Sequence, residues 1–296
     1  MINNKFIKCL IPPYLYVILI NLKKKFDLIL GKKPFYSNEI SLDISKLKVS
    51  KENVWDTPNW INHVEKNLKS SYKDKSSLHQ DALLEAVKTI FYLTNKKVIN
   101  VIDFGGGCGI LVPHLRSLSG ELKIKINSFV IDSEININLG KKFLDNENNY
   151  DLKFYDQKKF SLFNILENFK ENDNNLILNI SSVFQYIHQY KEFLSNSLKT
   201  IRPLYVCITR FPKCENASED AFGIQNISTP LGYCGSVIVN LFEKNSLINE
   251  MKKLNYELLT EKYNYLGDTQ YFTDCDDPSY KKITITAYIF IKKTID

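Results

Sequence analysis

Four glycines lie close together, one residue after an aspartate, in the stretch Asp103-Phe-Gly-Gly-Gly-Cys-Gly109. Because glycine has no Cβ, such a loop can turn sharply and let a ligand approach the backbone. The β-branched residues at 98–102 predict a strand before the loop, and the leucine spacing at 110–118 predicts a helix after it. Strand, glycine loop and helix in this order are typical of sites for nucleotide-type ligands.

The spacing of this loop excludes one nucleotide chemistry and disfavours a second. A Walker loop needs Lys and then Ser or Thr after its last glycine, whereas Ile110 and Leu111 follow Gly109. A dinucleotide fold needs a small residue at the last position of G-x-G-x-x-G/A, which is Ile110 when counted from Gly105. Asp103-Phe-Gly also spells the magnesium triplet of protein kinases, but no His-Arg-Asp precedes it, so we interpret that match as accidental.

Carboxylates follow the next two predicted strands. Residues 124–131 predict a strand that ends at Asp132, with Glu134 just beyond, and residues 152–155 predict a short strand that ends at Asp156. Either Asp132 or Glu134 could accept hydrogen bonds from ribose hydroxyls, as in dinucleotide sites. The structural alternatives are a helix cap for Asp132 and a surface loop for Asp156.

Polar side chains also follow the fourth predicted strand, at 176–180. They are Ser181, Ser182, Gln185 and Tyr186. Each is a candidate for contact with a ligand, and each could instead cap the helix predicted at 190–200. His188 is the most available general base, because a neutral imidazole can accept a proton near neutral pH.

Arg210 follows the fifth predicted strand, at 204–209. Its planar donors suit a carboxylate or phosphate of a substrate, and a surface ion pair is the alternative role. Together with His188, Tyr186 and Gln185, Arg210 completes our set of candidate catalytic residues.

Strands that alternate with helices predict an α/β fold with a mostly parallel sheet covered on both faces. Two final strands, at 256–263 and 283–291, are predicted to pair antiparallel because no helix separates them. Polar residues at 211–240 predict an insertion that forms a long functional loop of the acceptor pocket. The other predicted helices lie at 59–70, 78–93, 135–144, 162–169 and 245–254.

The chain is divided into an N-terminal helical extension with a linker, at 1–75, and a ligand-binding domain at 76–296. The apolar run at 10–22 predicts a helix that either packs on the domain or lies at a membrane surface, with the lysines up to residue 25 toward anionic headgroups. Prolines inside the run oppose a secretion signal, and the run is too short to span a bilayer. Trp55 and Trp60 either anchor the core or stack on a ligand.

Composition limits the function further. The chain has 296 residues, a net charge of +6 and scattered cysteines with no C-x-x-C pair, which favours an ordinary globular protein in a reducing compartment. Its four histidines lack metal-ligand spacing, so we predict no bound metal. No basic tract or motif accompanies the positive charge, so we predict no nucleic-acid partner.

The pattern Asp-x-Gly-x-Gly-x-Gly at 103–109 resembles motif I of the class I S-adenosylmethionine-dependent methyltransferases. A narrower resemblance over about residues 53–290 is to methyltransferases associated with bacterial cell-surface polysaccharide gene clusters. Its markers are Ser-Ser-Val-Phe-Gln-Tyr-Ile from Ser181, Thr-Arg-Phe-Pro from Thr209, Gln225, and Asn255-Tyr256.

The resemblance implies a Rossmann-like class I methyltransferase fold, with a seven-stranded sheet whose last strand is inserted antiparallel. It implies S-adenosyl-L-methionine as cofactor. The residues expected to bind it are Asp103, Gly105, Gly106, Gly107, Gly109, Asp132, Glu134, Asp156, Ser181 and Ser182. The expected acceptor is a sugar or glycan precursor in the cytoplasm. The alternatives are a catalytically inactive binding or scaffolding protein of the same fold and a nicotinamide-dependent enzyme, which Ile110 disfavours.

Overall fold

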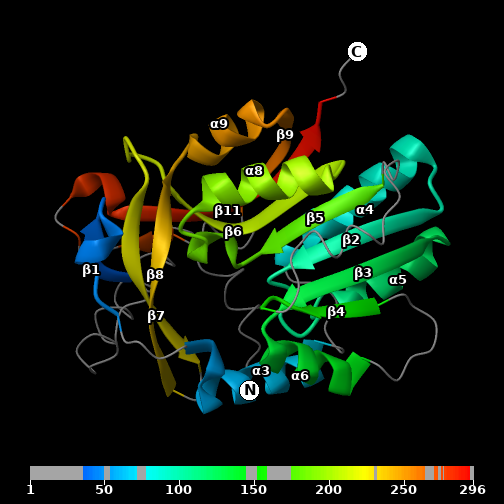
Figure 1. Ribbon diagram of the computed structural model, residues 1–296, viewed down its shortest axis with the longest axis horizontal. Helices are drawn as coiled ribbons and strands as arrows, with labels where there is room; N and C mark the ends of the chain where they lie inside the picture. The colour runs from blue at the N-terminus through cyan, green and yellow to red at the C-terminus, as the bar shows by residue number, and fades with distance from the viewer. Residues whose placement is uncertain are drawn as a thin grey trace, which may run out of the picture.

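The computed structural model describes residues 36–49, 54–71, 78–144, 152–158, 175–229, 232–263, 270–272, 275 and 277–293. Its described strands form one hydrogen-bonded sheet of 11 strands, and seven of these lie side by side as the main part of the sheet (Figure 1). In spatial order they are β4 (Leu152–Asp156), β3 (Lys125–Asp132), β2 (Val98–Phe104), β5 (Leu176–Ser181), β6 (Tyr205–Cys214), β11 (Lys282–Lys292) and β9 (Tyr256–Tyr263).

The strand directions identify the fold. The first five strands in this order are parallel to one another, whereas β11 is antiparallel to both β6 and β9. The last strand is thus inserted antiparallel between two earlier ones. This confirms the Rossmann-like class I methyltransferase fold and the antiparallel pairing of the last two long strands.

Helices cover both faces of the sheet, as an alternating α/β sequence requires. On one face, α4 (Leu78–Thr94) and α5 (Val112–Leu122) bury side chains such as Leu83 and Leu115 against the strands. On the other face, α8 (Tyr190–Ile201) and α9 (Ser246–Lys253) bury Leu194 and Met251 in a second core cluster. The helix α6 (Glu134–Leu144) packs beside α5 and β4.

The prediction of a long loop at 211–240 is wrong. The strand β6 continues to Cys214, and β7 (Ala221–Thr229) and β8 (Gly232–Glu243) form an antiparallel hairpin. The hairpin stands next to the main sheet in Figure 1 and joins it where β8 pairs with the end of β6. Phe242 of β8 stacks on Phe211 of β6 with ring centroids 4.3 Å apart. The insertion is therefore a β-hairpin packed on the main sheet rather than an irregular loop.

The N-terminal part of the chain adds a strand to this hairpin, so its description as a helical extension with a linker needs correction. The strand β1 (Tyr36–Ser41) lies within the range 1–75 that we predicted to be helix and linker, and it pairs with β7. The helix α3 (Pro58–Ser71) agrees with the prediction at 59–70. Its Glu65 Oε1 lies 3.9 Å from Lys142 Nζ of α6. The helices predicted at 10–22 and 162–169 lie outside the described residues.

Short elements complete the described structure. They are β10 (Gln270–Phe272) and the 3-10 turns η1 (Ile44–Lys46), η2 (Val54–Asp56), η3 (Phe184–Tyr186) and η4 (Pro278–Tyr280). Within the described ranges, no helix has both the length and the apolar character that crossing a bilayer would require.

Replacing Tyr256 by phenylalanine is expected to lower the free energy of unfolding by about 1–2 kcal/mol. The Tyr256 hydroxyl is buried and donates to the Pro203 carbonyl oxygen at 2.7 Å, which ties β9 to the start of β6. Urea unfolding followed by circular dichroism measures the difference. Tyr92→Phe is the matched control, because Tyr92 is 72% exposed and its variant should unfold like the wild type. Equal stabilities for Tyr256→Phe and the wild type would contradict this role.

Candidate functional site

The glycine loop connects β2 to α5 at the carboxyl edge of the sheet. Gly105 donates its N–H to the Ile131 carbonyl of β3 at 2.8 Å and has φ +70°, a left-handed conformation that favours glycine. A Cβ at Gly105 would lie 2.5 Å from Val183 Cγ1, and a Cβ at Gly106 would lie 2.4 Å from Asp103 Oδ2. The loop therefore packs so closely on its neighbours that side chains are excluded from these positions.

Asp103 lies beneath the loop, 2% exposed. Its Oδ1 accepts a hydrogen bond from Asn179 Nδ2 at 2.8 Å. Burial raises the pKa of the Asp103 carboxyl to about 7; the Asn179 hydrogen bond opposes this shift and the charge of Asp132 adds to it. This carboxylate is held in a place where a positive charge would stabilise its ionised form.

Three buried acceptor atoms at this edge have no hydrogen-bond partner among the described residues. They are Asp103 Oδ2, Asn179 Oδ1 and Gln185 Oε1. Asp103 and Asn179 are paired across β2 and β5, and Gln185 donates its Nε2 to the Ser182 carbonyl just past β5. Because buried polar atoms in folded proteins are normally partnered, these acceptors indicate a ligand that supplies donors.

The carboxylates after β3 and β4 lie side by side, since Asp132 and Asp156 are register partners. Asp132 Oδ2 accepts from the Gly107 N–H at 2.8 Å, and its Oδ1 accepts from the Ser133 N–H and Asn136 Nδ2, both at 2.7 Å. Asp132 thus holds the glycine loop to the start of α6. Asp156 accepts from the Lys158 N–H at 2.9 Å, and Glu134 is exposed at the first position of α6.

Ser181 and Ser182 lie at the end of β5, next to β6. The Ser181 hydroxyl accepts a hydrogen bond from Thr209 Oγ1 at 2.8 Å. Ser182 has φ +63°, and its N–H donates to the Thr209 carbonyl at 3.2 Å. Both serines are therefore held by β6, and neither caps α8, for which no side-chain cap is present.

Tyr186 joins the carboxyl edge to the hairpin, because its hydroxyl donates to Gln225 Oε1 of β7 at 2.9 Å. Burial raises the Tyr186 pKa to about 12, against a lowering by a hydrogen bond with Gln185 and by the charge of Arg210. The Trp55 ring lies 5.2 Å from the Tyr186 ring. Tyr186 is thus a neutral hydroxyl near pH 7 rather than a base.

Trp55 and Trp60 pack edge to face, 4.6 Å apart, against the far end of the hairpin. Their apolar neighbours include Val54 and Ile227. Both rings are partly exposed. They anchor the N-terminal segment on the hairpin and also present aromatic surface at its boundary with solvent.

His188 lies at the base of the hairpin. Its ring is 5.9 Å from the Phe222 ring, and the residue as a whole is exposed. Desolvation of the ring lowers the His188 pKa, against a raising hydrogen bond with Asn240. The imidazole is therefore neutral near pH 7. It sits by Phe222 and Asn240, whereas Tyr186 contacts Gln225 farther along β7.

Arg210 is displaced from the place that the sequence predicted for it. It lies in the middle of β6 rather than after the strand, and its Nη1 is 3.5 Å from Ser182 Oγ. Asn179 was not among the predicted site residues; its signal is a single amide within the otherwise apolar run Leu-Ile-Leu-Asn-Ile. A polar residue in a fully buried strand needs a partner, and here that partner is Asp103.

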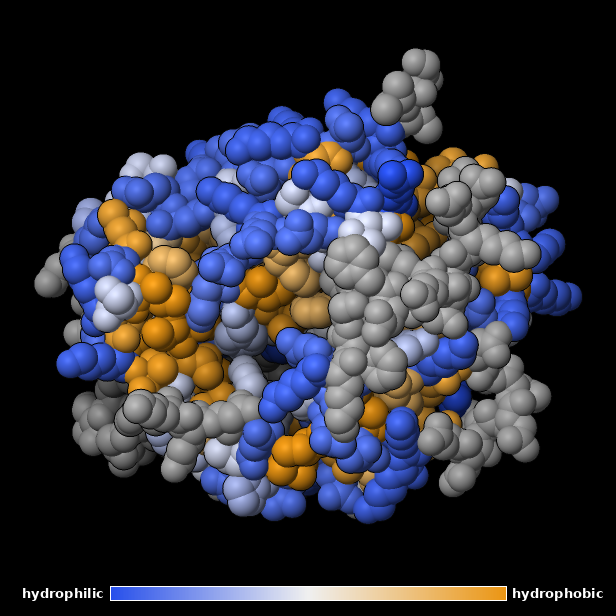
Figure 2. Space-filling view, in the orientation of Figure 1, coloured by the Kyte–Doolittle hydropathy of each residue, from blue (hydrophilic) through white to orange (hydrophobic). Residues whose placement is uncertain are grey.

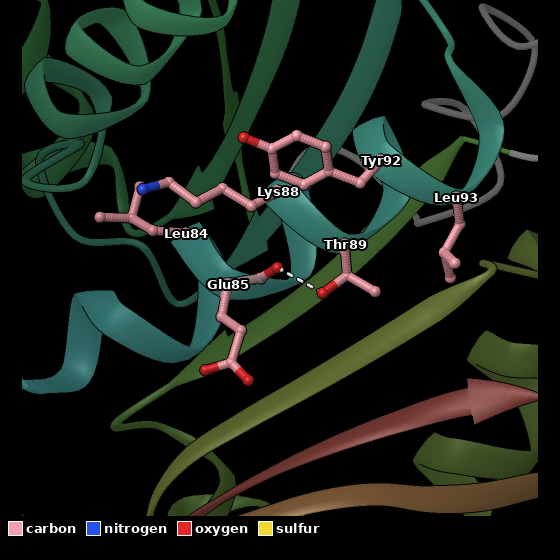
Figure 3. A pocket seen from close by; sticks show the side chains of 6 residues that line it. All are labelled: Leu84, Glu85, Lys88, Thr89, Tyr92 and Leu93. Atoms are coloured by element: carbon pink, nitrogen blue, oxygen red, sulfur yellow. Dashed lines mark hydrogen bonds between the residues drawn. The ribbon is translucent and has the colours of Figure 1, made fainter.

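The surface is hollowed near the centre of the face in Figure 2, between the hairpin and the ends of β3 and β4 as Figure 1 places them. A second, shallow hollow lies on α4, where Leu84, Glu85, Lys88, Thr89, Tyr92 and Leu93 point away from the helix (Figure 3). None of the candidate site residues lines the hollow on α4. The carboxyl edge of the sheet is where the candidate residues converge.

Comparisons with solved structures give alignments of low sequence identity and low TM-score. A methyltransferase from Clostridium acetobutylicum described as S-adenosylmethionine-dependent aligns at 10% identity over 80% of this chain and 99% of its own, with a TM-score of 0.44. The sugar N-methyltransferase KedS8 from Streptoalloteichus aligns at 9% identity over 85% and 99%, with a TM-score of 0.43. No protein-family model and no curated protein matches the chain. The strand order, rather than these alignments, carries the assignment of the fold.

Proposed function

We propose that this protein is a methyltransferase that uses S-adenosyl-L-methionine. The observation that carries the proposal is the set of unpartnered buried acceptors, Asp103 Oδ2 and Asn179 Oδ1, beneath a glycine loop at the carboxyl edge of a class I sheet. Open α/β sheets bind ligands at this edge. An ammonium such as that of the methionine moiety supplies the donors and the positive charge that these acceptors lack.

The residues of the edge fit the rest of the cofactor. Gly105, Gly106, Gly107 and Gly109 would line the methionine moiety, and Ser181 would border it from β5. Asp132 or Glu134 would accept the ribose hydroxyls. Asp132 Oδ1 already accepts two bonds from the chain and Oδ2 accepts one, and each carboxylate oxygen has two lone pairs, so capacity for one hydroxyl remains on Oδ2. Asp156, the register partner of Asp132, would contact the adenine.

When bound, the cofactor supplies an activated methyl group on a sulfonium. The contribution of this chain is to hold the acceptor atom in line with that group and to exclude water, which can supply several kcal/mol of the barrier reduction. Among the candidate catalytic residues, His188 is the one with a neutral imidazole able to take a proton. Tyr186 and Gln185 would position an acceptor hydroxyl or amine by hydrogen bonds.

The acceptor that we propose is a sugar or glycan precursor of a cell-surface polysaccharide. The sequence resemblance supports this choice, and so does the combination of aromatic rings and amides at the hairpin, namely Trp55, Tyr186 and Gln225. Such a reaction would take place in the cytoplasm. Peripheral membrane contact through residues 10–25 is part of this proposal, and those residues lie outside the described structure.

Calorimetric titration of the full chain with S-adenosylmethionine, S-adenosylhomocysteine and NAD tests the cofactor. We expect binding of the first two with micromolar Kd and no binding of NAD. Binding of NAD alone would reject the proposal. Incubation with methyl-labelled cofactor and surface-glycan precursors then separates an active enzyme from a scaffolding protein of the same fold, because a scaffold would bind the cofactor without incorporating label.

A further inference from the structure

Arg210 occupies an unusual place in the sheet. Within β6, all of which the structure describes, Arg210 is the one exposed residue. The pairing with β11 shifts register here: Phe211 pairs with Thr286 and Ile208 with Tyr288, so that two residues of β6 face Ala287. This is a β-bulge, a feature that re-aims a side chain out of the regular pleat.

The backbone at this bulge is strained. Arg210 has φ +57° and the adjacent Ser182 has φ +63°, both in the left-handed region that non-glycine residues rarely adopt. The two residues lie side by side because Ser181 and Thr209 are register partners. Backbone strain at a residue persists only where the surroundings enforce it, and it concentrates at ligand sites.

The guanidinium that the bulge presents has no carboxylate within ion-pair distance among the described residues. The Arg210 Nη1 atom lies 3.5 Å from the Ser182 hydroxyl, and the Arg210 charge acts to lower the pKa of Tyr186. A planar guanidinium with a hydroxyl beside it matches the oxygens of a carboxylate or a phosphate. The cation is thus positioned without an anionic partner among the residues that the structure describes.

The position of Arg210 favours the acceptor over the cofactor as the source of this anion. In the sheet, β5 separates β6 from β2, so Arg210 lies about 10 Å, or two strand spacings, from the strand that carries Asp103. The proposed ribose and adenine ligands lie on the opposite side of β2, after β3 and β4. Tyr186 and Gln225, which border the hairpin, are on the side of Arg210.

We propose that Arg210 and Ser182 form an oxyanion subsite that anchors a carboxylate or phosphate of the acceptor. The acceptor class is therefore anionic, either a sugar acid or a phosphorylated sugar. The assignment of this anion to a methyl acceptor rests on the proposed function. The subsite itself rests on the bulge and on the guanidinium, which has no carboxylate partner among the described residues.

The test titrates the full chain, saturated with S-adenosylhomocysteine, with inorganic pyrophosphate, with glucuronate and with glucose. We expect wild-type protein to bind pyrophosphate or glucuronate with a Kd at least tenfold below that of Arg210→Gln, and not to bind glucose. The ligand that binds distinguishes a phosphate from a carboxylate. Arg202→Gln is the matched control, because Arg202 is also exposed with φ +50° but lies before β6, at the opposite edge, and should bind like the wild type.

A second comparison separates the two sources of the anion. If Arg210 held the cofactor carboxylate, Arg210→Gln would weaken S-adenosylhomocysteine at least tenfold and leave methylthioadenosine, which lacks the carboxylate, unchanged; that result would overturn the subsite. Equal anion binding by wild type and Arg210→Gln, or none by the wild type, would also overturn it. Absence of S-adenosylhomocysteine binding in the wild type would instead reject the proposed function, and the anion titrations can be repeated without it.

Discussion

Replacing Gly106 by alanine is expected to weaken S-adenosylhomocysteine binding at least 100-fold, which corresponds to about 2.7 kcal/mol. The backbone at Gly106 does not have positive φ, so alanine is tolerated there as a conformation. Its Cβ, however, would lie 2.4 Å from Asp103 Oδ2 and 2.6 Å from Asp103 Cγ. The methyl group would displace the carboxylate from Asn179 and fill the space that a donor needs.

Calorimetry measures the affinity, and circular dichroism measures stability, which should fall by about 1–3 kcal/mol from overpacking. Gly120→Ala is the matched control. Gly120 lies in α5 with no atom within 4 Å of the added Cβ, so this variant should gain about 0.5–1 kcal/mol in stability and keep its affinity. A folded Gly106→Ala protein with wild-type affinity would show that the cofactor does not contact Asp103.

Replacing Asp103 by asparagine is expected to move stability and binding in opposite directions. The folded-state pKa of Asp103 is about 7 and its ordinary value is 3.8, so between these pH values the folded chain holds a proton that the unfolded chain has lost. Stability therefore falls as pH rises through this window, by about 4 kcal/mol in all. Asparagine does not ionise, so the variant should lack this decline.

The measurement is the difference in unfolding free energy between Asp103→Asn and the wild type at pH 5 and pH 8. We expect the stability of Asp103→Asn relative to the wild type to increase as pH rises. At pH 8 the affinity of the variant for S-adenosylhomocysteine should be at least tenfold lower, because the ligand ammonium loses its anion. Wild-type binding near pH 6.5 should release a proton, which titration in buffers of different ionisation enthalpy detects. A stability difference that is independent of pH would show that Asp103 titrates normally.

The sequence predicted the strands and helices whose own residues specify them. Apolar runs such as Leu176–Ser181 become buried strands in any parallel sheet, and the leucine spacing before and after the glycine loop defines α4 and α5. The glycine loop and its aspartates were predictable for the same reason, since the acidic residues directly end strands that are parallel and in register.

The hairpin was not predictable, because its polar residues are stabilised by contacts distant in sequence. Three of its residues are of types common in loops, yet all three are buried: Gln225, Asn226 and Asn240. Gln225 accepts from Tyr186, and Asn240 donates to the Ile187 carbonyl, so the segment after β5 supplies the partners of these two residues, whereas Asn226 accepts from Ser236 within the hairpin. Tertiary hydrogen bonds here override local propensity.

The orientation of Arg210 escaped prediction for a related reason. The bulge that exposes it arises where β6 pairs with β11, which comes much later in the chain. Thr-Arg-Phe-Pro carries no glycine that would mark a left-handed residue. Pairing between distant strands, rather than local sequence, decides which side of the sheet this cation faces.

The pairing of β6 with β11 also determines the order in which the chain can fold. β11 comes after all the other strands in sequence, yet it lies between β6 and β9. Until it inserts, β6 presents an unpaired edge and β9 has no neighbour among the described strands. Joining such distant segments requires closure of a long loop, which makes folding slow. Completion of the sheet, including the bulge at Arg210, is therefore a late event, and chains that lack β11 should aggregate through the open edge of β6.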